Sequence, residues 1–115
     1  MRGQTNVVEP IATHSVIETS LRALVFRAPI ERPIVTSFGT MLNRPMVLVR
    51  CEDADGTVGW GEVWCNFPNV GSEYRAQLVE HVFTPLVQGR AIDDPAAVTA
   101  ALSEATSVLA LQTGE

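Results

Sequence analysis

Residues 46–64 read MVLVRCEDADGTVGWGEVW, which is an apolar run, a turn and a second run of β-forming residues. In the apolar run, residues 46–52, alternate side chains share a face, as they do in a strand. The Asp-Gly pair at 55–56 supplies the positive φ angle that a tight hairpin turn requires. Gly59 and Gly61 fall on one face of the return strand, where two missing side chains let a neighbour approach closely. The stretch therefore predicts a β-hairpin.

A further strand and an irregular tail are expected on the N-terminal side of this hairpin. From Ser15 to Ala28, apolar and β-branched residues recur at alternate positions, and Leu24 and Phe26 add apolar area to the other face. Residues 1–14 are polar and irregular, so we expect a flexible tail there. One domain is then expected over residues 15–115.

Two irregular stretches follow strands in the sequence. Three prolines bracket the first, which we expect to form a loop from Ile30 to Arg44. The second runs from Cys65 to Gly71. A long loop without structure of its own is often functional. The first one carries Phe38, Met41 and Leu42, which either lie exposed or fold back over the sheet.

Two helices are expected after the strands. The first runs from Ser72, a plausible cap, to Val87, and its apolar residues repeat every four positions. These residues are Tyr74, Leu78, Val82 and Leu86, with Val79 and Phe83 beside them. The second begins at Asp94-Pro95, with Asp94 as the cap and Pro95 in the first turn. Its expected buried stripe consists of Ala101, Leu102, Ala105, Val108 and Leu109. Strands gathered before helices predict an α+β domain, with a three-stranded antiparallel meander followed by packed helices.

Composition excludes several classes of protein. The chain has 115 residues and a formal net charge of −5, which argues against a nucleic-acid surface. It has no run of about 18 apolar residues that would span a membrane. Cys51 and Cys65 are best interpreted as reduced thiols of a cytoplasmic protein rather than as a disulfide. His14 and His81 lie far from both cysteines, so no metal-ligand spacing connects them.

Several polar and aromatic residues have both a functional and a structural interpretation. Glu62 could be a base or a metal ligand, but a lone carboxylate at a strand end that pairs with an arginine is the better interpretation. Asp53 and Asp55 resemble a pair of acids, yet they are better explained as turn residues. Trp60 is expected in the core. Trp64 adjoins the second loop and could either pack or stack on a ligand.

The order of these motifs resembles the N-terminal capping domain of the mandelate racemase and muconate lactonizing enzyme family, in the enolase superfamily. The resemblance runs from about Val16 to Leu109, and it implies that the capping domain, residues 15–115, is cut short at its C-terminal end. Its most telling piece is GWGE at 59–62, preceded by Arg44-Pro45 before the hairpin. PLVQG at 85–89 followed by Asp94-Pro95 matches the junction between two helices of that domain.

The resemblance implies an enzyme in which this domain covers a (β/α)₈ barrel. The barrel supplies acidic Mg²⁺ ligands and acid/base residues, and the reaction begins by removing a proton α to a carboxylate. Racemases, cycloisomerases and acid-sugar dehydratases work in this way. The implied cofactor is Mg²⁺, and the implied partners are the barrel, a small carboxylate substrate and further copies of the complete enzyme.

The same resemblance assigns pocket-lining residues to the two loops of the cap, which close over the barrel mouth. The candidates are Ser37, Phe38, Gly39, Met41, Trp64, Asn66 and Phe67. Without a barrel, we expect Phe38, Met41, Trp64 and Phe67 to be exposed.

The chain departs from the family in having no lysine, since all eight basic residues are arginines. The paired lysines of the barrel have no counterpart here, and we assign no catalytic or metal-binding residue. We therefore expect the chain to be inactive by itself. The alternative is a stand-alone α+β binding or assembly module without chemistry.

Overall fold

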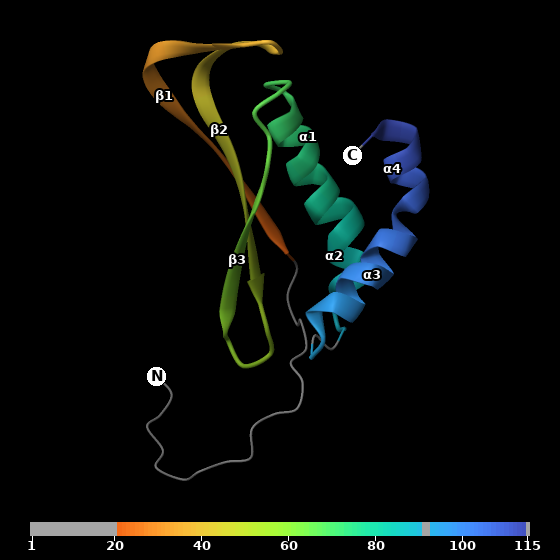
Figure 1. Cartoon of the computed structure of the whole chain (residues 1–115). Helices are drawn as coiled ribbons and strands as arrows, with labels where there is room; N and C mark the ends of the chain where they lie inside the picture. The colour runs from red at the N-terminus through yellow and green to blue at the C-terminus, as the bar shows by residue number, and fades with distance from the viewer. Residues whose placement is uncertain (1–20, 91–92, 115) are drawn as a thin grey trace, which may run out of the picture.

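The computed structural model describes residues 21–90 and 93–114, and it contains a three-stranded antiparallel sheet followed by helices (Figure 1). The strands are β1 (Arg22–Thr36), β2 (Gly39–Glu52) and β3 (Val58–Val63), and β2 lies between the other two. The predicted α+β meander is confirmed. The predicted tail and the first residues of the predicted N-terminal strand lie outside the described residues.

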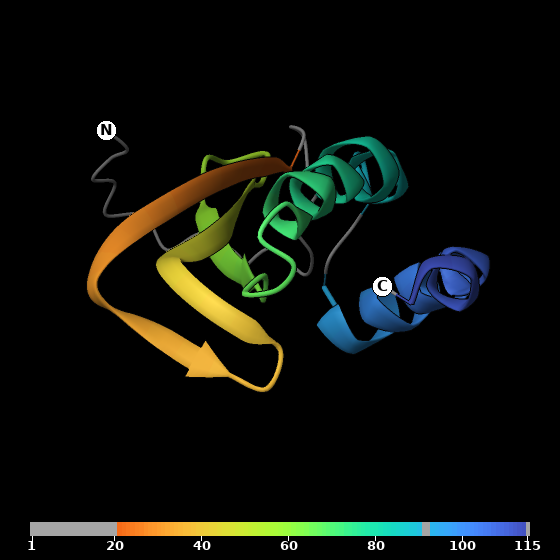
Figure 2. The ribbon, with the colours of Figure 1, turned by 90° about the horizontal axis from the view of Figure 1, so that it is seen from above.

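The helices form two units. The first is a continuous helical segment that covers one face of the sheet, and the second lies beside it, away from the sheet (Figures 1 and 2). The first unit consists of α1 (Gly71–Leu78), the π-helical segment η1 (Val79–Phe83) and α2 (Thr84–Val87). The second consists of α3 (Pro95–Ala105) and α4 (Ser107–Thr113). None of the helices in the described part of the chain is long and apolar enough to cross a membrane.

Local side-chain chemistry forms the predicted turn and the predicted helix start. Asp53 Oδ1 accepts hydrogen bonds from the backbone N–H groups of Asp55 (3.1 Å) and Thr57 (2.9 Å). Gly56 has a φ of +89°, in the region that favours glycine. Asp94 Oδ1 accepts hydrogen bonds from the N–H groups at positions 96 and 97, which confirms it as the cap of α3.

The predicted loop from Ile30 to Arg44 is wrong, because most of it is strand. β1 and β2 continue as a long hairpin whose turn is Ser37-Phe38, and their pairing shifts register between Pro29 and Ile34. Prolines are tolerated on edge strands and at bulges, because their missing N–H removes no required ladder bond there. β1 is an edge strand. Pro45 lies on β2 outside the segment that pairs with β3, which begins at Val47.

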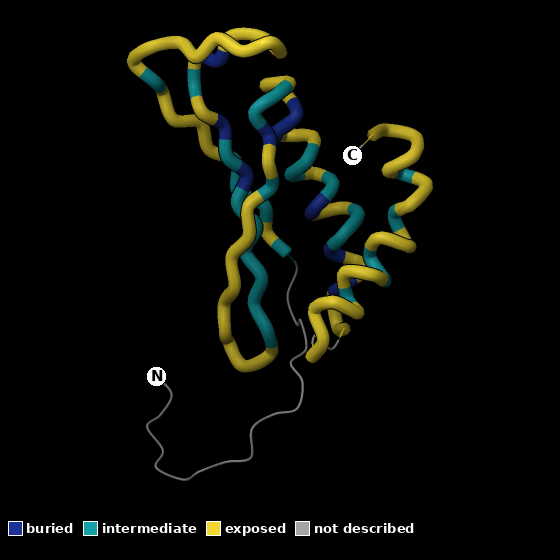
Figure 3. Tube along the Cα trace, viewed as in Figure 1, coloured by how far each residue is buried: buried dark blue, intermediate teal, exposed yellow. Residues whose placement is uncertain are grey.

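The core lies between β2 and the first helical unit. Val47 is 0% exposed, and Met41 and Pro45 are buried at alternate positions on the same face of β2. Figure 3 shows that buried residues gather where β2 meets these helices, whereas the hairpin tip and the second helical unit are largely exposed. The helices contribute Val79 and Val87. One face of the sheet therefore carries most of the packing.

The buried face of the first helical unit differs from the predicted one. Tyr74 and Leu86 are exposed, whereas Val79, Thr84 and Val87 are buried. The π-helical segment accounts for the difference after Phe83, because it adds a residue to one turn and rotates the residues that follow it. Thr84 donates both its N–H and its hydroxyl to the carbonyl of Val79, five residues earlier.

Three further predictions about packing are also wrong. Ser72 does not cap α1: it lies inside the helix and is fully buried, and the N-cap position is Val70. Trp60 is 59% exposed rather than in the core. The predicted stripe of the last helix is not buried by the described residues, since neither α3 nor α4 contains a buried residue. Gly59 and Gly61 have open space beside them among the described residues.

Candidate functional site

The tip of the β1–β2 hairpin and the connection between β3 and α1 lie together at one end of the molecule (Figure 1). Ser37 and Phe38 form the turn of the hairpin, and residues 64–70 form the connection. The ring centroids of Phe38 and Phe67 are 6.1 Å apart, with the rings tilted by 38°. Aromatic pairs interact over this distance. The two segments therefore meet through aromatic side chains.

A threonine and a glycine set the shape of the hairpin tip. The hydroxyl of Thr36 accepts a hydrogen bond from the N–H of Phe38 (3.1 Å) and donates one to the carbonyl of Gly39 (3.1 Å). Gly39 has a φ of +142°, a conformation that residues with a side chain rarely adopt. A Cβ atom added there would lie 3.7 Å from the Phe67 ring. The glycine therefore allows the turn that carries Phe38.

A pocket of about 490 Å³ lies between the tip and the connection. One wall comes from residues 38–43 and Pro45, and the other from residues 66–69. Five of the seven predicted site residues line this pocket, although whether they contact a substrate stays a prediction. They are Phe38, Gly39, Met41, Asn66 and Phe67. Two stretches some thirty positions apart in sequence thus form one site.

Ser37 and Trp64 do not line the pocket. Trp64 instead contacts Arg75 of α1. The guanidinium of Arg75 donates a hydrogen bond to the Trp64 carbonyl (3.0 Å), and its central carbon lies 5.6 Å from the centre of the indole ring. This is a cation–π geometry. Trp64 is the first residue of the connection. It is 61% exposed, so it is largely open to solvent.

Sequence reasoning missed Asn43 and Pro45 in the pocket wall. Alternation along a strand places residues 41, 43 and 45 on one face, so the signal was present once the segment is known to be a strand. The expected exposure of Met41 is also wrong, because its side chain is only 6% exposed. Phe38 is 81% exposed and agrees with the expectation.

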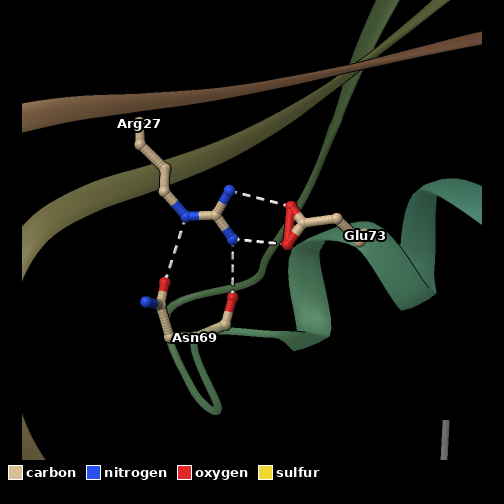
Figure 4. Close-up of polar contacts among 3 residues, drawn as sticks. All are labelled: Arg27, Asn69 and Glu73. Carbon is tan, nitrogen blue, oxygen red and sulfur yellow. Dashed lines mark hydrogen bonds and ion pairs between the residues drawn. The ribbon is translucent and has the colours of Figure 1, made fainter.

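Arg27 of β1 fixes the connection against the sheet (Figure 4). Its Nη1 and Nη2 atoms donate to the two carboxylate oxygens of Glu73 on α1, at 2.8 and 2.6 Å. Its Nε donates to Asn69 Oδ1 (3.2 Å), and its Nη2 also donates to the Asn69 carbonyl (2.9 Å). Paired hydrogen bonds of this kind add geometric specificity. One guanidinium thus holds a strand, a loop and a helix at the base of the pocket.

The Arg27–Glu73 pair makes stability depend on pH. The hydrogen bonds from Arg27 lower the pKa of the Glu73 carboxyl, and the same bonds raise the pKa of Arg27. A lowered carboxyl pKa contributes stability above the pKa of the unfolded chain, and this contribution disappears as pH falls through the folded pKa. The difference in melting temperature between the wild type and Glu73→Gln should therefore be present near neutral pH and disappear as pH falls through the lowered pKa of the Glu73 carboxyl.

Glu104 provides the control for this measurement, because it is an exposed carboxylate on α3. Glu104→Gln should follow the wild-type melting temperature over the whole pH range. If the two variants show the same dependence on pH, the Arg27–Glu73 pair does not stabilise the connection.

The described residues do not fit a metal site, since they contain no group of three His, Cys, Asp or Glu side chains that could hold an ion. Glu62 makes no ion pair with a described residue, so its expected arginine partner is not found in this part of the chain. The pocket wall itself contains amides, a hydroxyl and apolar side chains, and no charged residue. The site can bind and enclose a ligand, but it offers no group for proton transfer.

Comparison with known proteins finds the same fold in part of several longer enzymes. A mandelate racemase/muconate lactonizing enzyme from Bordetella bronchiseptica is 51% identical, with a TM-score of 0.70, over 88% of this chain and 25% of its own. The muconate lactonizing enzyme of Pseudomonas fluorescens, solved with muconolactone, is 26% identical, with a TM-score of 0.68, over 78% of this chain and 25% of its own.

A curated relative is the N-succinyl-L-Arg/Lys racemase of Bacillus cereus, which is 26% identical over 63% of this chain and 20% of its own length. The chain thus spans a quarter or less of each of these relatives. Residues 19–110 match the family described as mandelate racemase/muconate lactonizing enzyme, N-terminal domain. The chain belongs to this family, as its N-terminal domain.

Proposed function

We propose that this chain is the substrate-capping domain of a Mg²⁺-dependent enzyme that removes a proton α to a carboxylate. The observation that carries the proposal is the pocket between the hairpin tip and the connection, because both segments lie at one end of the molecule and face each other. Membership of the family supports a barrel after this domain. The complete reaction is that of a racemase, a cycloisomerase or an acid-sugar dehydratase.

Exposed apolar side chains at the hairpin tip support the proposal that a partner domain covers it. Val35, Phe38 and Leu42 are all strongly exposed there. Exposed apolar side chains that gather in one place can mark an interaction site. We propose that the tip packs against the mouth of the barrel. Closing it would exclude water and strengthen electrostatic interactions inside the site.

The proposal divides the work between the two domains. The described residues of this chain bind, orient and cover the substrate, and they supply no metal ligands. Mg²⁺ and the acid/base groups belong to the barrel, where the ion would offset the charge that develops on the substrate carboxylate. Cys51 and Cys65 are free cysteines, which suits the cytoplasm. Assembly into a homo-oligomer belongs to the same proposal.

Exchange of the α-hydrogen with D₂O tests this function. The complete enzyme that carries this chain should exchange the α-hydrogen of at least one acid in a panel of sugar acids and hydroxy acids, in the presence of Mg²⁺. Residues 1–115 alone should exchange none. Exchange by the isolated chain, or a complete enzyme that exchanges no member of the panel, contradicts the proposal.

A further inference from the structure

The pocket wall has a composition that restricts what it can bind. Its apolar side chains include Phe38, Met41 and Phe67, and none of the described residues that line it is charged. Met41 is only 6% exposed, so this part of the wall is shielded from water. An unpaired charge placed against such a surface loses hydration without gaining a partner. The wall therefore disfavours a charged ligand group.

The two arginines that contact the connection, Arg27 and Arg75, are already engaged. Arg27 binds Glu73 and Asn69, beneath the connection. Arg75 binds the carbonyl and the ring of Trp64. Recruiting either arginine as a counter-charge would break contacts that hold the connection in place. Arg44 is adjacent to two lining residues in sequence, but strand alternation places it on the other face of β2. None of the described residues that line the pocket thus offers an ion-pair partner.

Two amides remain available for hydrogen bonding. Asn43 lies on the β2 wall and Asn66 on the opposite wall, and neither side-chain amide makes a hydrogen bond to a described residue. Each offers two donors and one acceptor without a net charge. Asn69 differs, because its side-chain oxygen accepts from Arg27. The free amides suit a neutral polar group such as a carboxamide or a hydroxyl.

We infer that the pocket binds an uncharged, mainly apolar group of the substrate. This group lies at the end of the substrate remote from its reacting carboxylate. Asn43 and Asn66 can form hydrogen bonds to one neutral polar atom of the group. The inference rests on the proposed function, and it adds the substrate class. Substrates that carry an ammonium, a guanidinium or a second carboxylate at that end are discriminated against.

Four carboxylic acids of equal length test the inference with the complete enzyme and Mg²⁺. Their distal groups are a methyl, a carboxamide, an ammonium and a carboxylate, and the readout is kcat/KM for α-hydrogen exchange in D₂O. The kcat/KM values of the methyl and carboxamide acids should exceed those of both charged acids by at least about tenfold. The reason is that a charge placed against the wall loses its hydration and gains no partner.

Two amide-to-acid variants sharpen this test. Asn66→Asp adds a carboxylate to the pocket wall and should raise the ratio of ammonium to methyl acid by at least about tenfold. Gln77→Glu makes the same chemical change on the exposed surface of α1 and should leave the ratio unchanged.

A wild-type enzyme that exchanges a charged acid best overturns the inference and leaves the proposed function standing. The same holds if Asn66→Asp changes the ratio no more than Gln77→Glu does. An enzyme that exchanges none of the four acids but does exchange a sugar acid or a hydroxy acid overturns the inference alone. An enzyme that exchanges neither the four acids nor any member of that panel contradicts the proposed function, and the inference with it.

Discussion

Replacing Phe67 by alanine in the complete enzyme is expected to lower kcat/KM by about tenfold to a hundredfold, the range that a lost apolar pocket contact gives. The Phe67 ring lines the pocket and lies against Phe38 across it. Its removal takes away apolar contact area and opens the wall to water. Steady-state kinetics with the best substrate measure the effect, and substrate preference should change along with kcat/KM.

Phe26→Ala is the matched control for this prediction. Phe26 lies on β1, half-exposed and outside the pocket. The control should change kcat/KM by less than about twofold, the size of a remote surface effect. Met41→Ala should behave like Phe67→Ala, because Met41 is the buried part of the same wall. If both pocket variants keep the wild-type kinetics, the two segments are only structural.

Val47→Ala is expected to lower the free energy of unfolding of the chain by about 2–3 kcal/mol, from lost transfer free energy and the cavity left behind. Val47 is 0% exposed on the central strand, where β2 meets the helices. Such a loss is a large fraction of the stability of a small domain. Urea unfolding followed by circular dichroism measures it.

Leu48→Ala provides an internal comparison, because residue 48 points to the other face of the same strand. Leu48 is half-buried, and the described helices do not cover that face (Figure 2). The substitution removes more carbon than Val47→Ala does, yet it should cost less, about 1 kcal/mol. If Leu48→Ala proves the more destabilising of the two, the core does not lie on the helix side of the sheet.

The hairpin over residues 46–64 could be predicted because its signals are local. Alternation fixes the strand faces, and the side chain of Asp53 with the backbone of Gly56 fixes the turn. The cap of α3 at Asp94 is local in the same sense. Each of these features needs only a few neighbouring residues, and each agrees with the structure.

The long extension of β1 and β2 could not be predicted in this way. Proline is a strong local signal for a break, and its tolerance on an edge strand depends on which strands are neighbours. That information appears only once the sheet order β1-β2-β3 is known. The buried face after Phe83 was missed for a related reason, because a single π-helical turn rotates the residues that follow it, so that Val87 is buried and Leu86 is exposed.

The pocket was predicted in outline but not in detail. A hairpin tip and the end of the neighbouring strand lie at the same end of an antiparallel sheet, so Phe38 and Phe67 could be expected to meet. The place of Asn43 in the pocket wall was missed because its segment was predicted to be a loop. Once the segment is known to be a strand, alternation places Asn43 on the same face as Met41. Trp64 is placed by its contact with Arg75, which no short-range pattern reveals.

The central claim is that substrate binds against the wall formed by the hairpin tip. Met41 and Met46 lie on opposite faces of β2, and of the two only Met41 lines the pocket. In the complete enzyme labelled with ¹³C-methyl methionine, saturating substrate should shift the Met41 signal and leave the Met46 signal in place. Substrate that is turned over while Met41 does not shift, or while Met46 shifts instead, would contradict the claim.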